Sequence, residues 1–157
     1  MKIRRFIDSD AAEVTEMIKT TERISNSKDY SPEYLEAICA KQTPDWAARR
    51  ASRTHFYVAE EDGRIVGCGA VGPYRDKEDE SALFNIFVLP EYQGRGIGRA
   101  IVETLESDEF FLRAKRVEIA ASITGVGFYR KLGYDFKDGK KELDDGMLYH
   151  LEKIRTV

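Results

Sequence analysis

Three glycines within five positions, set between an apolar run and an amphipathic helix, constrain this sequence most. The run at 82–88 is apolar on both faces except at Asn85, which predicts a strand in the middle of a sheet. Gly94, Gly96 and Gly98 follow it and lead into the helix. Glycine lets backbone N–H groups point into one concavity without obstruction, and a helix N-terminus adds unpaired donors and partial positive charge. This arrangement suits a pyrophosphate.

Two better-known phosphate-binding loops do not fit these glycines. The loop of nucleotide triphosphatases needs Gly-Lys-Ser/Thr, which the sequence lacks. The dinucleotide fingerprint Gly-x-Gly-x-x-Gly fails because Arg99 stands where its third glycine would be. The plainer alternative is a flexible loop with a glycine at the start of a helix, and spacing alone leaves both interpretations open.

The composition is that of a folded protein, and 157 residues predict a single domain spanning 1–157. Hydrophobic residues make up 42% and charged residues 34%, so the chain can bury a core. A net charge of -3 gives no sign of the basic face that a nucleic-acid binder usually needs. Cys39 and Cys68, with only His55 and His150 to add, make a disulfide framework or a zinc site unexpected. We therefore expect no nucleic-acid partner and no metal.

No stretch of the sequence predicts a membrane segment or a signal peptide. The first residues carry basic side chains, but no apolar stretch follows them. No run approaches the roughly 20 apolar residues that a membrane span needs. We therefore expect a cytoplasmic protein without membrane contact.

The predicted elements alternate in a way that indicates a mixed α/β fold. Strands are expected at 2–7, 55–59, 65–71, 82–88, 117–121, 134–136 and 147–151. Helix-start signals, which are a capping side chain and in two cases a proline at the first helical position, stand at Asp8, Ser31-Pro32 and Thr43-Pro44. Further helices are expected from residue 97 and over 127–132.

A hairpin is expected between the second and third of these strands. Asp62-Gly63 is the dipeptide of a tight turn. Gly67 and Gly69 alternate along the return strand and leave room on one face for something to approach closely.

The glycine segment resembles the acyl-CoA signature of the GNAT superfamily of N-acetyltransferases, usually written Gln/Arg-x-x-Gly-x-Gly/Ala. Gln93, Gly96 and Gly98 stand at its defined positions. The residues at 86–92 are similar to the family's fourth strand and its exit. The segment 121–134 is similar to the family's last helix, which ends in Phe-Tyr-x-Lys-Leu-Gly-Phe/Tyr. Two motifs in the right order are more specific than either alone, although the first fifty residues match by pattern only.

The resemblance implies a mixed, mostly antiparallel, twisted sheet of about seven strands flanked by helices. Strands four and five would diverge into a V-shaped cleft that holds acetyl-CoA, with no metal. Pantetheine would pair with the main chain of strand four, and the pyrophosphate would lie on the amides from 94 to 99. The expected cofactor-binding residues are Ile86, Phe87, Val88, Gln93, Gly94, Arg95, Gly96, Ile97, Gly98, Arg99 and Ser122.

Tyr129 falls on the tyrosine that the superfamily commonly uses to protonate the departing CoA thiolate. A phenol with a pKa near 10 stays protonated at neutral pH and can donate to the sulfur. The competing interpretation is that Tyr129 only packs beside Phe128. Ser122 stands where many relatives carry an asparagine that meets the cofactor, and capping the following helix is its simpler role.

The general base is less well defined. Many relatives use a glutamate on the fourth strand, where this sequence has Ala82. Glu80 lies two residues earlier, on the same face of a regular strand, and is the nearest carboxylate. It is our candidate, although the end of a solvated acidic run competes with that role. Glu118 on the fifth strand and a water held by Asn85 are the alternatives.

The resemblance implies an N-acetyltransferase that acts on a primary amine of a small molecule or a protein by direct attack in a ternary complex. The acidic run 78–80 favours a cationic acceptor. One alternative is an acyl-CoA-binding sensor or regulatory module without turnover. Another is a toxin acting on aminoacyl-tRNA, against which the mild acidity of the chain argues. Relatives often dimerise, so the resemblance also allows a homodimer.

Overall fold

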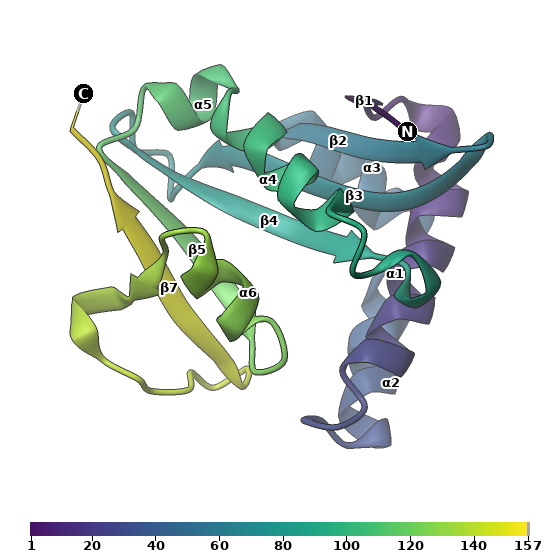
Figure 1. Ribbon diagram of the computed structural model, residues 1–157. Helices are drawn as coiled ribbons and strands as arrows, with labels where there is room; N and C mark the ends of the chain where they lie inside the picture. Colours follow the sequence, from purple (N-terminus) through teal and green to yellow (C-terminus); the bar gives the residue numbers. More distant parts are fainter. Residues whose placement is uncertain (157) are drawn as a thin grey trace.

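A computed structural model describes residues 1–156 and consists of a seven-stranded sheet with helices on both faces (Figure 1). The strand order is β1-β2-β3-β4-β5-β7-β6, and only β4 and β5 run parallel. The strands are β1 (Lys2–Arg5), β2 (His55–Glu61), β3 (Arg64–Pro73), β4 (Glu80–Val88), β5 (Arg116–Ser122), β6 (Asp135–Phe136) and β7 (Leu148–Ile154). This confirms the mixed, mostly antiparallel sheet, with the apolar run at its middle.

Three helices precede β2 and three follow β4. They are α1 (Ala11–Ser25), α2 (Pro32–Lys41), α3 (Pro44–Arg53), α4 (Ile97–Glu106), α5 (Glu109–Leu112) and α6 (Val126–Lys131). In Figure 1, α4 and α6 lie in front of the sheet, whereas α3 lies behind it. No helix within residues 1–156 is long and apolar enough to cross a membrane.

Two of the three predicted helix starts are confirmed by their caps. The Tyr34 N–H donates to Ser31 Oγ at 3.1 Å, and the Trp46 N–H donates to Thr43 Oγ1 at 3.2 Å. The first helix instead begins at Ala11, after a 3-10 turn at Asp8–Asp10, so the cap predicted at Asp8 is wrong. Asp10, and not Asp8, directly precedes the helix. The Asp10 carboxylate accepts the Ile7 N–H at 2.8 Å and also binds Arg4.

The glycines of β3 allow a helix to approach closely. A Cβ at Gly67 or Gly69 would lie 2.9 or 2.8 Å from the Ile101 side chain of α4. Ile101 and Leu105 of α4 are fully buried against this face. The room that these glycines leave is therefore filled by α4.

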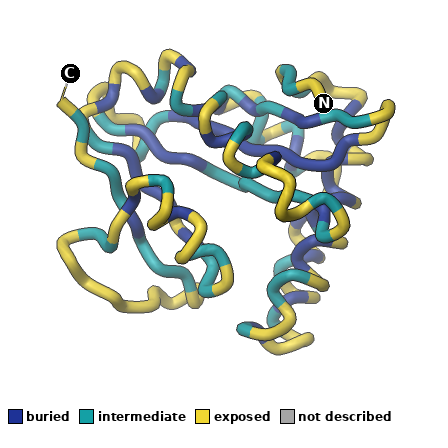
Figure 2. Tube along the Cα trace, viewed as in Figure 1, coloured by how far each residue is buried: buried dark blue, intermediate teal, exposed yellow. Residues whose placement is uncertain are grey.

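β4 and β5 pair only at one end and then diverge. Glu80–Leu83 pair with Arg116–Ile119, beyond which β4 keeps only β3 as a partner. A bulge interrupts that remaining ladder at Asn85, whose φ of 53° is in the left-handed region. From Phe84 onward β4 is half-buried, as Figure 2 shows. This confirms the predicted V-shaped divergence of strands four and five.

Candidate functional site

A cavity of about 970 Å³ opens where β4 and β5 separate, and α1, α4 and α6 complete its walls. A volume of this size suits a large organic ligand. Arg95 alone of the predicted cofactor residues lies outside the lining, with its guanidinium 5.0 Å from the Tyr92 ring. The other predicted cofactor residues line the cavity together with Tyr129: they are Ile86, Phe87, Val88, Gln93, Gly94, Gly96, Ile97, Gly98, Arg99 and Ser122.

The glycine loop presents a row of unpaired amide donors. Gly94 and Gly96 have φ values of 77° and 82°, and α4 begins directly after Gly96. Among residues 1–156, no hydrogen-bond acceptor pairs with the N–H groups from 94 to 99. The N–H groups of the first turn of α4 and of the glycine loop before it suit the oxygens of a diphosphate, so the residues present fit the group that the resemblance implies.

Gln93 joins this loop to its neighbours. Its Nε2 donates to the Val88 carbonyl and to Ser25 Oγ, both at 2.9 Å. These contacts hold the loop at the exit of β4 and against the end of α1. Gln93 therefore shapes the loop, and its direct contact with a cofactor stays a prediction.

Ser122 caps the turn that leads into α6. Its Oγ accepts the Gly125 N–H at 3.0 Å. The N-cap of α6 is Gly125, which has no side-chain cap, so Ser122 closes the turn before the helix and does not cap the helix itself. A cofactor contact of Ser122 stays a prediction.

The hydroxyl of Tyr129 is free to act within the cleft. Tyr129 is 8% exposed, and its hydroxyl has no hydrogen-bond partner within residues 1–156. Burial, with a smaller effect from Cys68, raises the pKa of the phenol. The group therefore keeps its proton at neutral pH and has an unused donor.

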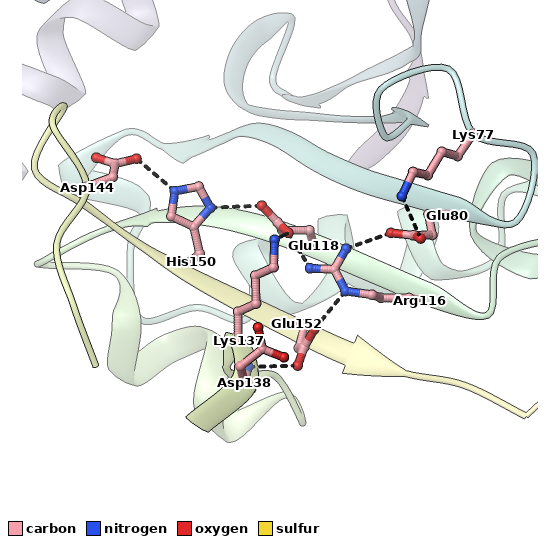
Figure 3. Close-up of polar contacts among 9 residues, drawn as sticks. All are labelled: Lys77, Glu80, Arg116, Glu118, Lys137, Asp138, Asp144, His150 and Glu152. Carbon is pink, nitrogen blue, oxygen red and sulfur yellow. Dashed lines mark hydrogen bonds and ion pairs between the residues drawn. The ribbon is translucent and has the colours of Figure 1, made fainter. Parts of the chain in front are cut away.

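Glu80 does not line the cleft. Its Oε1 accepts from Arg116 at 2.8 Å, and its Oε2 pairs with Lys77 at 3.2 Å (Figure 3). Burial favours the protonated form, but hydrogen bonds from Arg116 and Lys77 hold the pKa of Glu80 below its ordinary value. The other acidic residues of the run, Glu78 and Asp79, also lie outside the cleft lining. The run therefore gives no local support for a cationic acceptor.

Glu118 and His150 line the cleft as a bonded pair. His150 Nδ1 lies 2.8 Å from a Glu118 oxygen, and Nε2 lies 2.8 Å from Asp144 (Figure 3). Glu118 is 3% exposed and also contacts Arg116 and Lys137. Burial would raise the pKa of Glu118, but bonds from Arg116, His150 and Lys137 hold it below its ordinary value. The sequence signal for this pair was Glu118, a charged residue inside an apolar strand.

Replacing His150 should cost more stability at low pH than at high pH. Burial disfavours the imidazolium, but bonds to Glu118 and Asp144 raise the pKa of His150 above its ordinary value. Stability from a raised pKa is fully present below the unfolded-state pKa and is lost as pH rises through the folded-state pKa. Urea unfolding of the wild type and His150→Gln at about pH 5.5 and about pH 9 measures this difference. An equal cost at both pH values would contradict the prediction.

The α1 and α3 side of the cleft carries charged groups that the sequence patterns did not single out. Glu22 of α1 and Arg50 of α3 both line it. The segment that contains them has similar numbers of acidic and basic residues, so counting charges could not identify them. The packing of α1 against β4 and of α3 on α1 brings these two side chains to the cavity.

Comparison with known proteins gives one family. The model of the Acetyltransferase (GNAT) domain matches residues 52–135, just over half of the chain. An uncharacterized N-acetyltransferase from Chlorobaculum tepidum is 34% identical over 88 residues, covering 55% of this chain and 52% of that protein. The chain spans about half the length of the curated relatives it matches.

Two solved structures show the same fold. The PaiA N-acetyltransferase from Thermoplasma acidophilum, in complex with coenzyme A, has a TM-score of 0.82 at 20% identity, with 98% of each chain covered. A GNAT family acetyltransferase from Brucella melitensis, in complex with acetyl-CoA, has a TM-score of 0.58 at 26% identity. That alignment covers 85% of this chain and 82% of the other.

Proposed function

Because the chain belongs to the GNAT acetyltransferase family, we propose that it transfers an acetyl group from acetyl-CoA to a primary amine in a ternary complex. The observation that carries this proposal is one cleft lined both by the glycine loop, whose amides are unpaired, and by Tyr129 with its free hydroxyl. The names of the relatives, which are those of N-acetyltransferases, support turnover. They give no support to a non-catalytic binding module.

The cleft offers a surface for two parts of acetyl-CoA, the diphosphate and the pantetheine. The amides from 94 to 99 would bind the diphosphate, because they are unpaired donors at a helix N-terminus. The edge of β4 at 86–88 has no partner strand toward β5, so pantetheine could pair with it as an added strand. Fixing the reactive group beside a bound amine lowers the entropic part of the barrier.

Tyr129 is the proposed catalytic acid. Acetyl-CoA supplies a thioester, and its carbon–sulfur bond breaks as the amine nitrogen forms the new amide. Tyr129 Oη would hold its proton for the departing sulfur, since the raised pKa keeps the phenol protonated. For the proton that the amine loses, Glu80 stays a prediction from sequence, and the proposal does not depend on it. Glu118 and Glu22 are the carboxylates that line the cleft.

Acetyl-CoA should raise the melting temperature of the protein. At about a hundredfold over its dissociation constant, a ligand adds roughly 2.7 kcal/mol. For a domain of this size we expect a rise of about 5–10 °C. Thermal unfolding with acetyl-CoA, and with NADH and ATP as controls, measures it. If millimolar acetyl-CoA does not raise the melting temperature of a folded sample, the proposal is wrong. If it does, candidate amines are then screened by measuring the free thiol of CoA that acetyl transfer releases.

Two glycine variants separate binding by the loop from general strain. Gly96 and Gly139 both have positive φ, 82° and 70°, and a Cβ at either meets nothing within 4 Å. Alanine strains both backbones similarly, but only Gly96 lies in the cleft. Gly96→Ala should weaken acetyl-CoA binding, whereas Gly139→Ala should lower stability alone.

A further inference from the structure

The cleft contains a positive charge without a counter-ion. Arg50 lies in the last turn of α3 and lines the cavity, and its Nε is buried without a hydrogen-bond partner. No carboxylate of residues 1–156 lies within 4.0 Å of its guanidinium. The Phe84 ring lies 4.5 Å from Arg50 Cζ and holds the group in place. An unpaired charge in a partly dry site is costly, so an anion from outside the chain would stabilise it.

Two amide oxygens of residues that line the same cleft also lack partners. Gln42 Oε1 and Asn85 Oδ1 are buried acceptors without a donor. Native structures leave few such atoms. The described part of the chain has four, and three of them belong to residues that line this cleft: Gln42 Oε1, Arg50 Nε and Asn85 Oδ1. Unfilled hydrogen bonds gathered at one place indicate a ligand with both donors and acceptors.

Glu22 adds a negative charge to the same side. It is 8% exposed, accepts from Asn26 at 2.7 Å, and forms no ion pair within residues 1–156. Burial raises the pKa of Glu22 despite the hydrogen bond from Asn26. Glu22 and Arg50 do not pair with each other, so the wall offers one charge of each sign.

Arg50 and the helix that follows the glycine loop lie on opposite faces of the sheet. The space above Gly69 is filled by α4, so its neighbour Ala70 points to the opposite face of the sheet. Phe84 is opposite Ala70 and shares that face, and Arg50 lies over it. The diphosphate loop, in contrast, leads into α4. Arg50 therefore faces the side of the cleft left for the acceptor.

We propose that the acceptor is a small amino acid: a primary amine that also carries a carboxylate, bound by the guanidinium of Arg50. The planar guanidinium can donate two parallel hydrogen bonds to a carboxylate. The amine then lies on the side of the cleft that Asn85, Gln42 and the carboxylate of Glu22 line. A polyamine would leave Arg50 without a counter-ion. This inference rests on the proposed acetyl transfer and names its substrate class.

The test compares each L-amino acid with its carboxamide, which keeps the amine and loses the negative charge. We expect at least one amino acid to be acetylated with a kcat/KM about 100-fold above that of its carboxamide. Arg50→Gln should lower kcat/KM for the acid about 100-fold, mainly through KM, and leave the carboxamide within a few-fold. Arg53→Gln is the matched control, because Arg53 is exposed in the same turn and lies outside the cleft lining.

Binding is measured separately, by calorimetry of amino acids added to the protein saturated with CoA. Acetylation of an amino acid and its carboxamide at equal rates would overturn the inference and leave acetyl transfer intact. Equal losses for both acceptors in Arg50→Gln, or no binding of any amino acid to the wild type, would also overturn it. If acetyl-CoA neither binds nor acetylates any amine, the proposed function itself fails.

Discussion

Tyr129→Phe is expected to lower kcat by about 10²–10⁴-fold and to leave the affinity for acetyl-CoA nearly unchanged. The variant removes one oxygen whose hydrogen-bonding capacity no residue of 1–156 uses, so no buried partner is left unsatisfied. The ring keeps its edge-to-face contact with Phe128, with centroids 5.2 Å apart. Any large loss of turnover therefore reports on the missing proton.

Tyr134→Phe is the matched control for that experiment. Tyr134 lies five residues away, is fully buried and donates to Glu106 at 2.8 Å, outside the cleft lining. Losing this bond should lower the melting temperature but leave kcat unchanged. Steady-state kinetics and calorimetric binding of acetyl-CoA on both variants distinguish the roles. If Tyr129→Phe keeps wild-type kcat, Tyr129 is a packing residue and the proposed acid is wrong.

The sequence could predict the glycine loop and the strand before it because their signals are local. The loop needs glycine where φ is positive, at Gly94 and Gly96, and the helix start follows within one residue. The strand before the loop was recognisable as central because both of its faces are apolar. These features depend on neighbours in the chain, which a single sequence contains.

The side of the cleft that Arg50 lines depends on contacts between distant segments, and it could not be predicted from the sequence. Arg50 reaches the cavity because α3 packs on α1 and places it over Phe84. Glu80 was expected in the cleft from strand alternation, but Arg116 of the neighbouring strand holds its carboxylate at the closed end of the V. Asp144 approaches His150 only because an exposed loop folds back onto β7. Charges on separate elements find their partners through tertiary structure, which alternation along one strand does not describe.

Arg116→Met is expected to destabilise the protein by about 3–5 kcal/mol, which is a fall in melting temperature of roughly 6–20 °C. Arg116 is 15% exposed and pairs with Glu80 of β4, Glu118 of β5 and Glu152 of β7 (Figure 3). It thus joins three strands at the closed end of the V, where β4 and β5 are paired. Methionine keeps much of the apolar stem but leaves three carboxylates close together without this cation.

The cost of Arg116→Met should also shrink as pH falls. Burial raises the pKa of Glu80 and of Glu118, but the hydrogen bonds from Arg116 help to hold both pKa values below their ordinary values in the folded protein. Stability from a lowered pKa is present above the unfolded-state pKa and is lost as pH falls through the folded-state pKa. Urea unfolding at about pH 7 and about pH 4.5 should therefore give a smaller gap between variant and wild type at the lower pH.

The control for this prediction is Arg130→Met, because Arg130 pairs with Asp135 at 3.2 Å but is 53% exposed. Water screens an exposed pair, so its loss should cost less than about 1 kcal/mol at either pH. An Arg116→Met variant no less stable than Arg130→Met would mean that the strands hold the closed end of the V without the buried cation. A gap that widens toward low pH would mean that the three carboxylates are not what Arg116 stabilises. The expected result instead makes one arginine the electrostatic link among three strands at the closed end of the V, from which β4 and β5 diverge to form the cleft.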